Sequence, residues 1–366
     1  MELFDIISPV ESRLASICQR NKIPMGGSME LLPLCNMRCK MCYIRQDPDE
    51  MKKIGRMLTL EEWIRIAKEA KEAGVVSLLL TGGEPFLYPD FRSLYHTLTD
   101  MGFVITMNTN ATLIDENLAG FLAERPCRRL NITLYGKDDA TYERLCGNPK
   151  GFTQVMRATD LLNKYKIPFR FQCTVTPENM DQIDDLYAIA KEKNTILVVN
   201  SHIFPPIRCI NETFQRISPK EEALSNLKAY RINNPHMTDQ DLAKNILHKI
   251  TQPNRSCMAE GLGCMAGLCG FWISWNGDLL PCGMFEEPKI SLLDHSFQES
   301  WDYIVAEVAK LHMYEGCYSC DKRNICTVCA AGCLTENHGD MSKKPNYICE
   351  STEHYYRLLK EMEKSN

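Results

Sequence analysis

The 366-residue sequence contains no apolar run as long as the roughly 18 residues that a membrane-spanning helix needs. Its beginning, MELFDIISPVESR, also lacks the basic region and apolar core of a secretory signal peptide. A net charge of −5 and a pI near 6.0 give no general attraction for nucleic acid or for an anionic membrane. The sequence therefore predicts a globular, cytoplasmic protein whose partners include neither nucleic acid nor membrane.

Histidine is absent near the first cysteines: the chain has 8 histidines and 18 cysteines, and the earliest histidine is His96. A long chain with no export signal is not expected to use its cysteines for disulfides. The clustering of the cysteines in two parts of the chain therefore indicates that they bind metal. Three cysteines stand at 35, 39 and 42, and ten more lie between Cys257 and Cys349. The other five are interpreted as small packing residues: Cys18, Cys127, Cys146, Cys173 and Cys209.

Short β-rich runs alternate with helical stretches along the first half of the chain. Strands are expected at 28–34, 76–80, 103–108, 129–135, 169–175 and 196–200. The stretch 59–74 is typical of a connecting helix, because Thr59 and Glu62 form a capping box and Gly74 ends the apolar pattern. Six strand–helix units predict an α/β fold, a partial (β/α)6 TIM-like barrel whose chemistry lies at the carboxyl ends of the strands.

The alternation of strands and helices ends after the sixth expected strand. A helical stretch is followed by a cysteine-rich segment, which predicts a smaller C-terminal domain. The expected parts are an N-terminal extension 1–26, the barrel 27–215, a helical linker 216–255, the cysteine-rich domain 256–350 and a terminal helix 351–366.

The first cysteine cluster, in LPLCNMRCKMCYIRQ, offers three thiols and no nearby histidine. A structural zinc site needs four ligands in a closed tetrahedron, so it does not suit this set. A cubane [4Fe–4S] cluster held by three cysteines keeps one iron open for another ligand. Cys35, Cys39 and Cys42 directly follow the first expected strand, and TGGEP at 81–85 follows the second, so both face one rim of the barrel.

The CxxxCxxC spacing followed by TGGEP resembles the radical S-adenosylmethionine (SAM) superfamily. The resemblance implies that SAM binds the open iron, receives one electron and yields a 5′-deoxyadenosyl radical, which takes a hydrogen atom from the substrate. It also implies that Gly82, Gly83 and Glu84 contact the methionine part of SAM. Taken alone, TGGEP is better explained as an ordinary strand-to-helix turn, and it is the combination with the cysteines that favours a SAM site.

Further SAM contacts are predicted from the same resemblance. The family has an aromatic residue just before its third cysteine, where this chain has Met41, while Tyr43 follows the cysteine; adenine can stack on either. The segment 131–147 resembles the family's fourth-strand region and offers Thr133 for the ribose and Arg144 for the carboxylate. Asn108 ends the third strand and is expected to face the cavity. Helix capping is the alternative role for these polar residues.

The C-terminal cysteines, with Gly277 between Cys264 and Cys282 and then a CxxCxxxxxC run, resemble the SPASM extension of some radical SAM enzymes. That resemblance implies two auxiliary [4Fe–4S] clusters. The auxiliary cluster nearer to the SAM site is assigned Cys257, Cys264, Cys282 and Cys333. The outer cluster is assigned Cys317, Cys320, Cys326 and Cys349. The spacing leaves open whether Cys326 or Cys329 is a ligand, and Cys269 is the expected spare. A zinc ribbon using Cys317, Cys320, Cys326 and Cys329 is the alternative.

The favoured substrate is a ribosomally made peptide that receives a crosslink, a thioether or an inverted stereocentre. Alternatives are a small-molecule or sulfatase-maturing radical SAM enzyme, and a non-catalytic iron–sulfur or zinc module. Because fewer than thirty residues precede the first strand, a separate peptide-recognition protein is expected beside a reductant such as flavodoxin or ferredoxin. Epimerisation would need a hydrogen donor, for which Cys146 or Cys173 is the candidate. No catalytic histidine is assigned.

Overall fold

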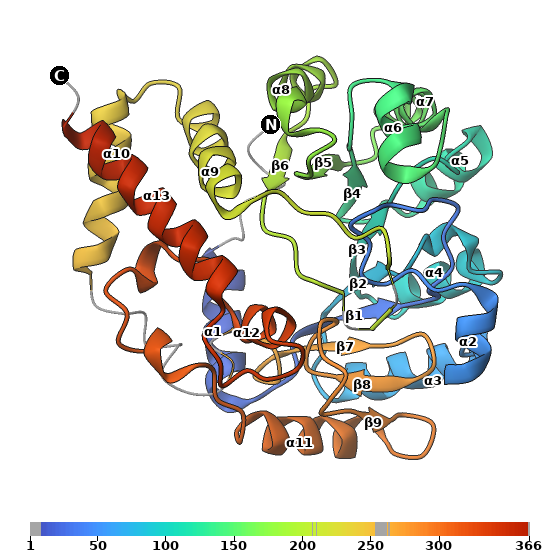
Figure 1. The fold of residues 1–366 in the computed structure, drawn as a ribbon. Helices are drawn as coiled ribbons and strands as arrows, with labels where there is room; N and C mark the ends of the chain where they lie inside the picture. The colour runs from blue at the N-terminus through green and yellow to red at the C-terminus, as the bar shows by residue number, and fades with distance from the viewer. Residues whose placement is uncertain (1–8, 207, 210, 253–261, 263, 365–366) are drawn as a thin grey trace.

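The computed structural model describes residues 9–206, 208–209, 211–252, 262 and 264–364. Its strands form one sheet in the order β6-β5-β4-β3-β2-β1-β7-β8-β9. The first six strands are mutually parallel, and each pairs with the next one along the chain. The predicted α/β partial barrel is therefore confirmed (Figure 1).

All six predicted strands are present, with boundaries that shift by a few residues. They are β1 (Gly26–Glu30), β2 (Ser77–Thr81), β3 (Val104–Thr109), β4 (Arg129–Thr133), β5 (Phe169–Thr174) and β6 (Leu197–Asn200). Since the strands are parallel, their carboxyl ends all lie at the same end of the barrel.

Helices between the strands cover the outer face of the sheet (Figure 1). They are α3 (Leu60–Glu72), α4 (Phe91–Asp100), α5 (Glu116–Glu124), α6 (Asp139–Cys146), α7 (Gly151–Lys164) and α8 (Ile183–Glu192). The predicted capping box of α3 is present between Thr59 and Glu62, and Gly74 has a left-handed φ of 107° after the helix end. Trp63 of α3 is fully buried, which shows how the apolar face of each helix fixes it on the sheet.

The C-terminal half extends the same sheet. Strand β7 (Gly270–Ile273) pairs in parallel with β1, and β8 (Asp278–Leu280) and β9 (Ile290–Ser291) continue it in antiparallel fashion. One continuous core joins residues of the barrel to residues beyond 270, among them Phe271 and Ile348. The cysteine-rich region is thus attached to the barrel along the strand that precedes the first cysteine cluster.

The remaining helices are α1 (Pro9–Asn21), α2 (Pro48–Ile54), α9 (Pro219–Asn233), α10 (Asp239–His248), α11 (Phe297–Val308), α12 (Ala330–Glu336) and α13 (Asn346–Lys364). The terminal helix α13 begins earlier than the predicted residue 351 and lies beside α9 and α10 (Figure 1). Leu227, Ala243 and Leu359 form the apolar contact between these three helices.

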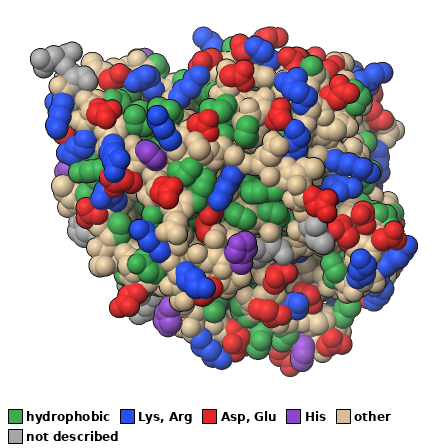
Figure 2. All heavy atoms as spheres, in the orientation of Figure 1, with side chains coloured by type: hydrophobic (Ala, Val, Ile, Leu, Met, Phe, Trp, Pro, Cys, Tyr) green, Lys and Arg blue, Asp and Glu red, His purple; other side chains and the backbone are tan. Residues whose placement is uncertain are grey.

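Acidic and basic side chains are interspersed on the face shown in Figure 2. Among the described residues, no helix combines the length and apolar character needed to cross a membrane.

Candidate functional site

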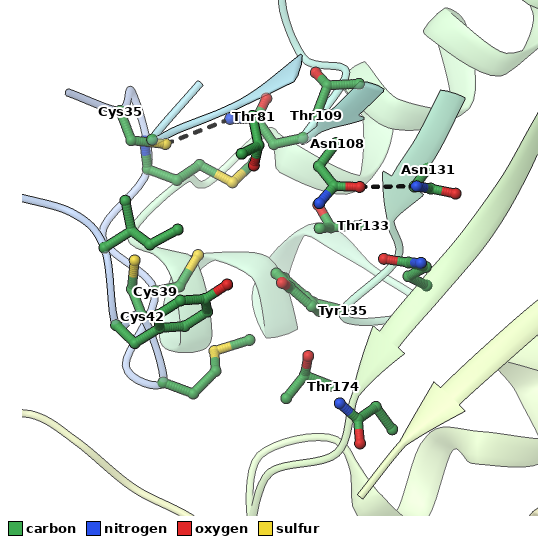
Figure 3. A pocket seen from close by; sticks show the side chains of 18 of the residues that line it. Cys35, Cys39, Cys42, Thr81, Asn108, Thr109, Asn131, Thr133, Tyr135 and Thr174 are labelled. Carbon is green, nitrogen blue, oxygen red and sulfur yellow. Dashed lines mark hydrogen bonds between the residues drawn. The ribbon is translucent and has the colours of Figure 1, made fainter. Parts of the chain in front are cut away.

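A cavity of about 300 Å³ lies where the carboxyl ends of the parallel strands meet the loop after β1. Its wall includes all three cysteines of the first cluster, Cys35, Cys39 and Cys42. Gly82 and Gly83 from the loop after β2 line the same space. Figure 3 shows the three thiols on one side of the cavity, facing polar side chains of the strand ends across it. The predicted meeting of the two loops at one rim is therefore present.

The cysteine loop is held in place by backbone hydrogen bonds. The Arg38 N–H donates to the Cys146 carbonyl (2.8 Å) and the Lys40 N–H to the Leu145 carbonyl (3.0 Å), so the last turn of α6 supports the loop from outside. These carbonyls are free to accept because a helix end leaves its final C=O groups unpaired within the helix.

The three thiols are partly buried, and burial opposes their ionisation in the absence of metal. Burial raises the pKa of the Cys35 thiol to about 12. Burial also raises the pKa of Cys42, and a hydrogen bond with Cys146 raises that of Cys39. Because iron binds the thiolate, cluster loading must release these protons.

Hydrogen-bond donors surround the thiols and would stabilise them in the negatively charged thiolate form that binds iron. Sγ of Cys35 accepts hydrogen bonds from the Met37 N–H (3.4 Å) and the Asn110 side-chain amide (3.6 Å). Sγ of Cys42 accepts one from the Arg45 N–H (3.3 Å). Within the described part of the chain, no three Cys, His, Asp or Glu side chains surround a single metal position. The donor set, not a preformed coordination geometry, is what points to a cluster here.

The glycine loop packs directly on the backbone that leads into the cysteines. The Gly83 N–H donates to the Leu32 carbonyl (2.7 Å), and the Glu84 N–H donates to the Leu34 carbonyl (2.9 Å). A Cβ added at Gly83 would overlap the Leu34 carbonyl oxygen, so the close approach of these two loops requires glycine.

Gly83→Ala is expected to lower SAM-dependent 5′-deoxyadenosine formation at least about tenfold, because the displaced backbone moves both walls of the cavity. Gly120→Ala in α5 is the control, since its Cβ would meet only the Tyr165 hydroxyl at 3.9 Å. That change should raise the free energy of unfolding by about 0.5–1 kcal/mol and leave the activity unchanged. Equal activities in the two variants would contradict the tight fit at Gly83.

Glu84, predicted to contact SAM, is fully buried and does not line the cavity. Its carboxylate accepts hydrogen bonds from the Asn110 N–H (2.8 Å) and the Thr109 hydroxyl (2.8 Å), and also from the Phe86 N–H (3.2 Å). Burial raises the pKa of Glu84 to about 7. In this structure its contacts fasten the glycine loop to the end of β3.

The wall opposite the thiols carries the other predicted SAM contacts. Asn108 and Thr133 both line the cavity, and the Asn108 side-chain oxygen accepts a hydrogen bond from Asn131 (2.8 Å; Figure 3). The Thr133 hydroxyl is buried and has no hydrogen-bond partner within the described structure. A buried hydroxyl without a partner costs about 1–3 kcal/mol, so a bound ligand with a polar group would stabilise it. Met41 and Tyr43 line the cavity together, so the choice between them for the adenine stays open.

Besides Glu84, two further predicted residues lie outside the wall of this cavity. Arg144 is half-exposed and pairs with Glu178 (3.4 Å), facing a separate hollow on the other side of the cysteine loop. Cys146 is fully buried at the end of α6, behind Cys39. Neither position brings the side chain to the cavity as the structure stands.

The C-terminal cysteines divide into two groups. The four that were assigned to the outer cluster line one cavity of about 480 Å³: Cys317, Cys320, Cys326 and Cys349. Elsewhere, burial raises the pKa of Cys282 to about 11, and the nearby thiols of Cys264 and Cys329 add to that rise. Cys333, which was assigned to the nearer cluster, lies beside Cys317, and their interaction lowers the pKa of Cys317 to about 7. Cys257 lies outside the described residues.

Sequence reasoning assigned no functional histidine, yet His202 lines the first cavity just beyond β6. Its Nδ1 lies 3.3 Å from the carboxylate of Glu222, which is completely buried on α9. The only sequence signal was the position of His202 after a strand end, because Glu222 is brought to it by the tertiary fold.

Comparison with known proteins agrees with this geometry. Residues 29–190 match the family model of the radical SAM superfamily. An AdoMet-dependent heme synthase of Methanosarcina barkeri is 25% identical over 337 residues, covering 87% of this chain and 95% of that protein.

Two solved structures show a similar fold. SuiB of Streptococcus suis bound to its precursor peptide SuiA aligns with a TM-score of 0.68 at 19% identity, covering 92% of this chain and 78% of SuiB. The structure of anSMEcpe with bound AdoMet and a peptide aligns with a TM-score of 0.68 at 21% identity, covering 93% and 99% of the two chains. Residues 29–190 therefore form a radical SAM domain, and the C-terminal cysteines fit a SPASM extension.

Proposed function

We propose that this radical SAM enzyme modifies a ribosomally made peptide, with SAM bound between the first three cysteines and the polar wall of the cavity. The observation that carries the SAM site is that three thiols, a glycine loop and the unpartnered Thr133 hydroxyl line one space. Cys35, Cys39 and Cys42 would hold a [4Fe–4S] cluster with one open iron. Such a cluster, once reduced, would supply the single electron needed to cleave SAM for hydrogen abstraction from the substrate.

The chain's own residues have distinct tasks in this proposal. Gly82 and Gly83 let the backbone approach the methionine part of SAM, and Thr133 offers its hydroxyl to the ribose. Asn108 adds an amide to the same wall, and Met41 or Tyr43 covers the adenine. Glu84 acts indirectly by fixing the glycine loop.

Two auxiliary clusters are proposed in the C-terminal region. The outer one takes the four cysteines that share a cavity, Cys317, Cys320, Cys326 and Cys349, as the sequence predicts. For the nearer one, the proximity of Cys264 and Cys329 to Cys282 favours Cys329 over Cys333 as the fourth ligand beside Cys257. Cys333 would then donate a hydrogen bond to Cys317, a contact that tunes cluster potentials in iron–sulfur proteins.

A peptide substrate is supported by fold similarity to SuiB with its precursor peptide and to anSMEcpe with a bound peptide. The proposed reactions are crosslink formation, thioether formation and epimerisation. Oxidation of a small molecule is the second candidate, because the M. barkeri relative that matches nearly the full chain is named a heme synthase.

The proposed partners are a reductant such as flavodoxin or ferredoxin and a separate peptide-recognition protein. A hollow of about 390 Å³ lies on the outer side of the cysteine loop and is lined by Arg38, Lys40, Arg45 and Arg144 beside Cys39 and Cys42. Glu143 and Glu212 line the same hollow, and Lys40 and Arg144 pair with Glu178. The cations outnumber these carboxylates, and that excess suits an acidic electron-transfer protein, since complementary charge speeds encounter.

The test uses the full chain, reconstituted anaerobically with iron and sulfide and supplied with dithionite, SAM and each short peptide encoded beside its gene. We expect 5′-deoxyadenosine together with a peptide that has lost two hydrogen atoms, or one with an inverted stereocentre at unchanged mass. A parallel reaction with small molecules such as heme precursors tests the second candidate. Formation of 5′-deoxyadenosine with every peptide unchanged would overturn the peptide assignment.

A further inference from the structure

The imidazole of His202 is held in a fixed position at the cavity wall. Its Nδ1 bonds to Glu222 (3.3 Å), and its ring packs edge-on against Phe204 with centroids 4.8 Å apart. The other Glu222 oxygen accepts a hydrogen bond from Ser351 of α13 (3.0 Å). Three segments far apart in the sequence therefore fix this single side chain.

The pairing with Glu222 determines what the other ring nitrogen offers. A carboxylate only accepts hydrogen bonds, so Nδ1 carries a hydrogen, and in the neutral imidazole Nε2 then presents a lone pair. His202 is 8% exposed, and its Nε2 is buried without a hydrogen-bond partner within the described residues. An acceptor oriented by a buried carboxylate and left unpaired at a cavity wall is arranged to receive a donor from a bound molecule.

Two side chains of the cavity wall have such unpartnered buried atoms, Thr133 and His202. Thr133 ends β4 and is assigned above to SAM. His202 follows β6, the edge strand farthest from β1 in the sheet order, whereas the cysteines follow β1. This separation from the cysteine loop favours a molecule other than the cofactor as the partner of His202.

We infer that Nε2 of His202 accepts a hydrogen bond from the substrate, and that Glu222 is its positioning residue. The donor would be a backbone N–H or a polar side chain of the peptide, next to the carbon that loses hydrogen. This inference rests on the proposed function, because it assigns a contact to the substrate that the SAM chemistry acts on.

The test compares holoenzyme variants with the peptide that the preceding experiment identifies. His202→Phe removes the acceptor, and its KM for the peptide is expected to rise at least about tenfold. His202→Gln places an amide oxygen near the position of Nε2, so its KM is expected to stay within about threefold of the parent value. Glu222→Gln loses the fixed tautomer and is expected to raise KM, and it supplies the same comparison should His202→Phe not fold.

His96→Phe is the matched control, since His96 lies on α4 and does not line the cavity. Its KM should not change. The Kd for SAM should be the same in every variant, as should 5′-deoxyadenosine formation without peptide. An unchanged KM in His202→Phe, or a weaker Kd for SAM in that variant, would overturn the inference while leaving the proposed function standing. Failure of the parent enzyme to modify any peptide would overturn the proposed function, and the inference with it.

Discussion

Replacing Cys35, Cys39 or Cys42 with alanine is expected to lower 5′-deoxyadenosine formation by more than about 10³-fold. Each thiol lines the cavity and would hold a different iron, and no other side chain replaces chemistry that a cofactor supplies. The measurement is chromatography of 5′-deoxyadenosine after anaerobic reaction with dithionite and SAM. The iron content of each variant should fall in parallel.

Cys127→Ala is the control for these substitutions. Cys127 is equally a cysteine, 4% exposed, but it belongs to the core and does not line the cavity. This variant should lose some stability and keep its iron and its SAM cleavage. Loss of activity in Cys127→Ala to the same degree would mean that the effect comes from general unfolding and not from a cluster.

Glu30→Ala is expected to reduce the free energy of unfolding by about 3–5 kcal/mol, because it leaves the cation of Arg208 without its buried partner. Glu30 ends β1 and is 1% exposed. Its carboxylate accepts hydrogen bonds from Arg208 (3.0 Å) and from the indole N–H of Trp272 on β7 (2.7 Å). The bond to Arg208 draws the segment after β6 across to the strand that precedes the cysteine loop. Urea unfolding of the cluster-free protein measures the change.

Lys52→Ala provides the comparison with a surface ion pair. Lys52 lies 2.8 Å from Asp49 on α2, where both side chains are largely exposed. Such pairs contribute at most about 1 kcal/mol. If the two substitutions shifted the unfolding midpoint equally, the buried contact of Glu30 would not have the role that its burial implies.

The sequence predicted the strands well because their apolar runs are strong local signals, and it misplaced their ends where tertiary structure decides. The first strand was expected over 28–34 and instead spans Gly26–Glu30. Leu31 and Leu32 are buried like strand residues, but Pro33 has no N–H to donate and the chain leaves the sheet before it. A buried side chain need not belong to a strand that is hydrogen-bonded in the sheet. An apolar run in the sequence predicts burial, but it does not predict where the strand ends.

The cysteine and glycine loops could be predicted because each follows its strand directly, and parallel strands place those loops at one rim. The direction of Arg144 could not be predicted, since it depends on Glu178 in the loop after β5. The pair of His202 and Glu222 also depends on a tertiary contact, as does the junction of β7 with β1. These features join segments whose proximity no local pattern encodes.

The most direct test of the account is pulsed electron–nuclear double resonance on the reduced, reconstituted protein with SAM labelled by ¹³C in its carboxylate and ¹⁵N in its amino group. The account predicts coupling of both labels to the cluster spin, which requires SAM on an iron that no cysteine occupies. Coupling should be absent when Cys35, Cys39 and Cys42 are replaced together. Absence of any coupling in the fully loaded parent protein would contradict it.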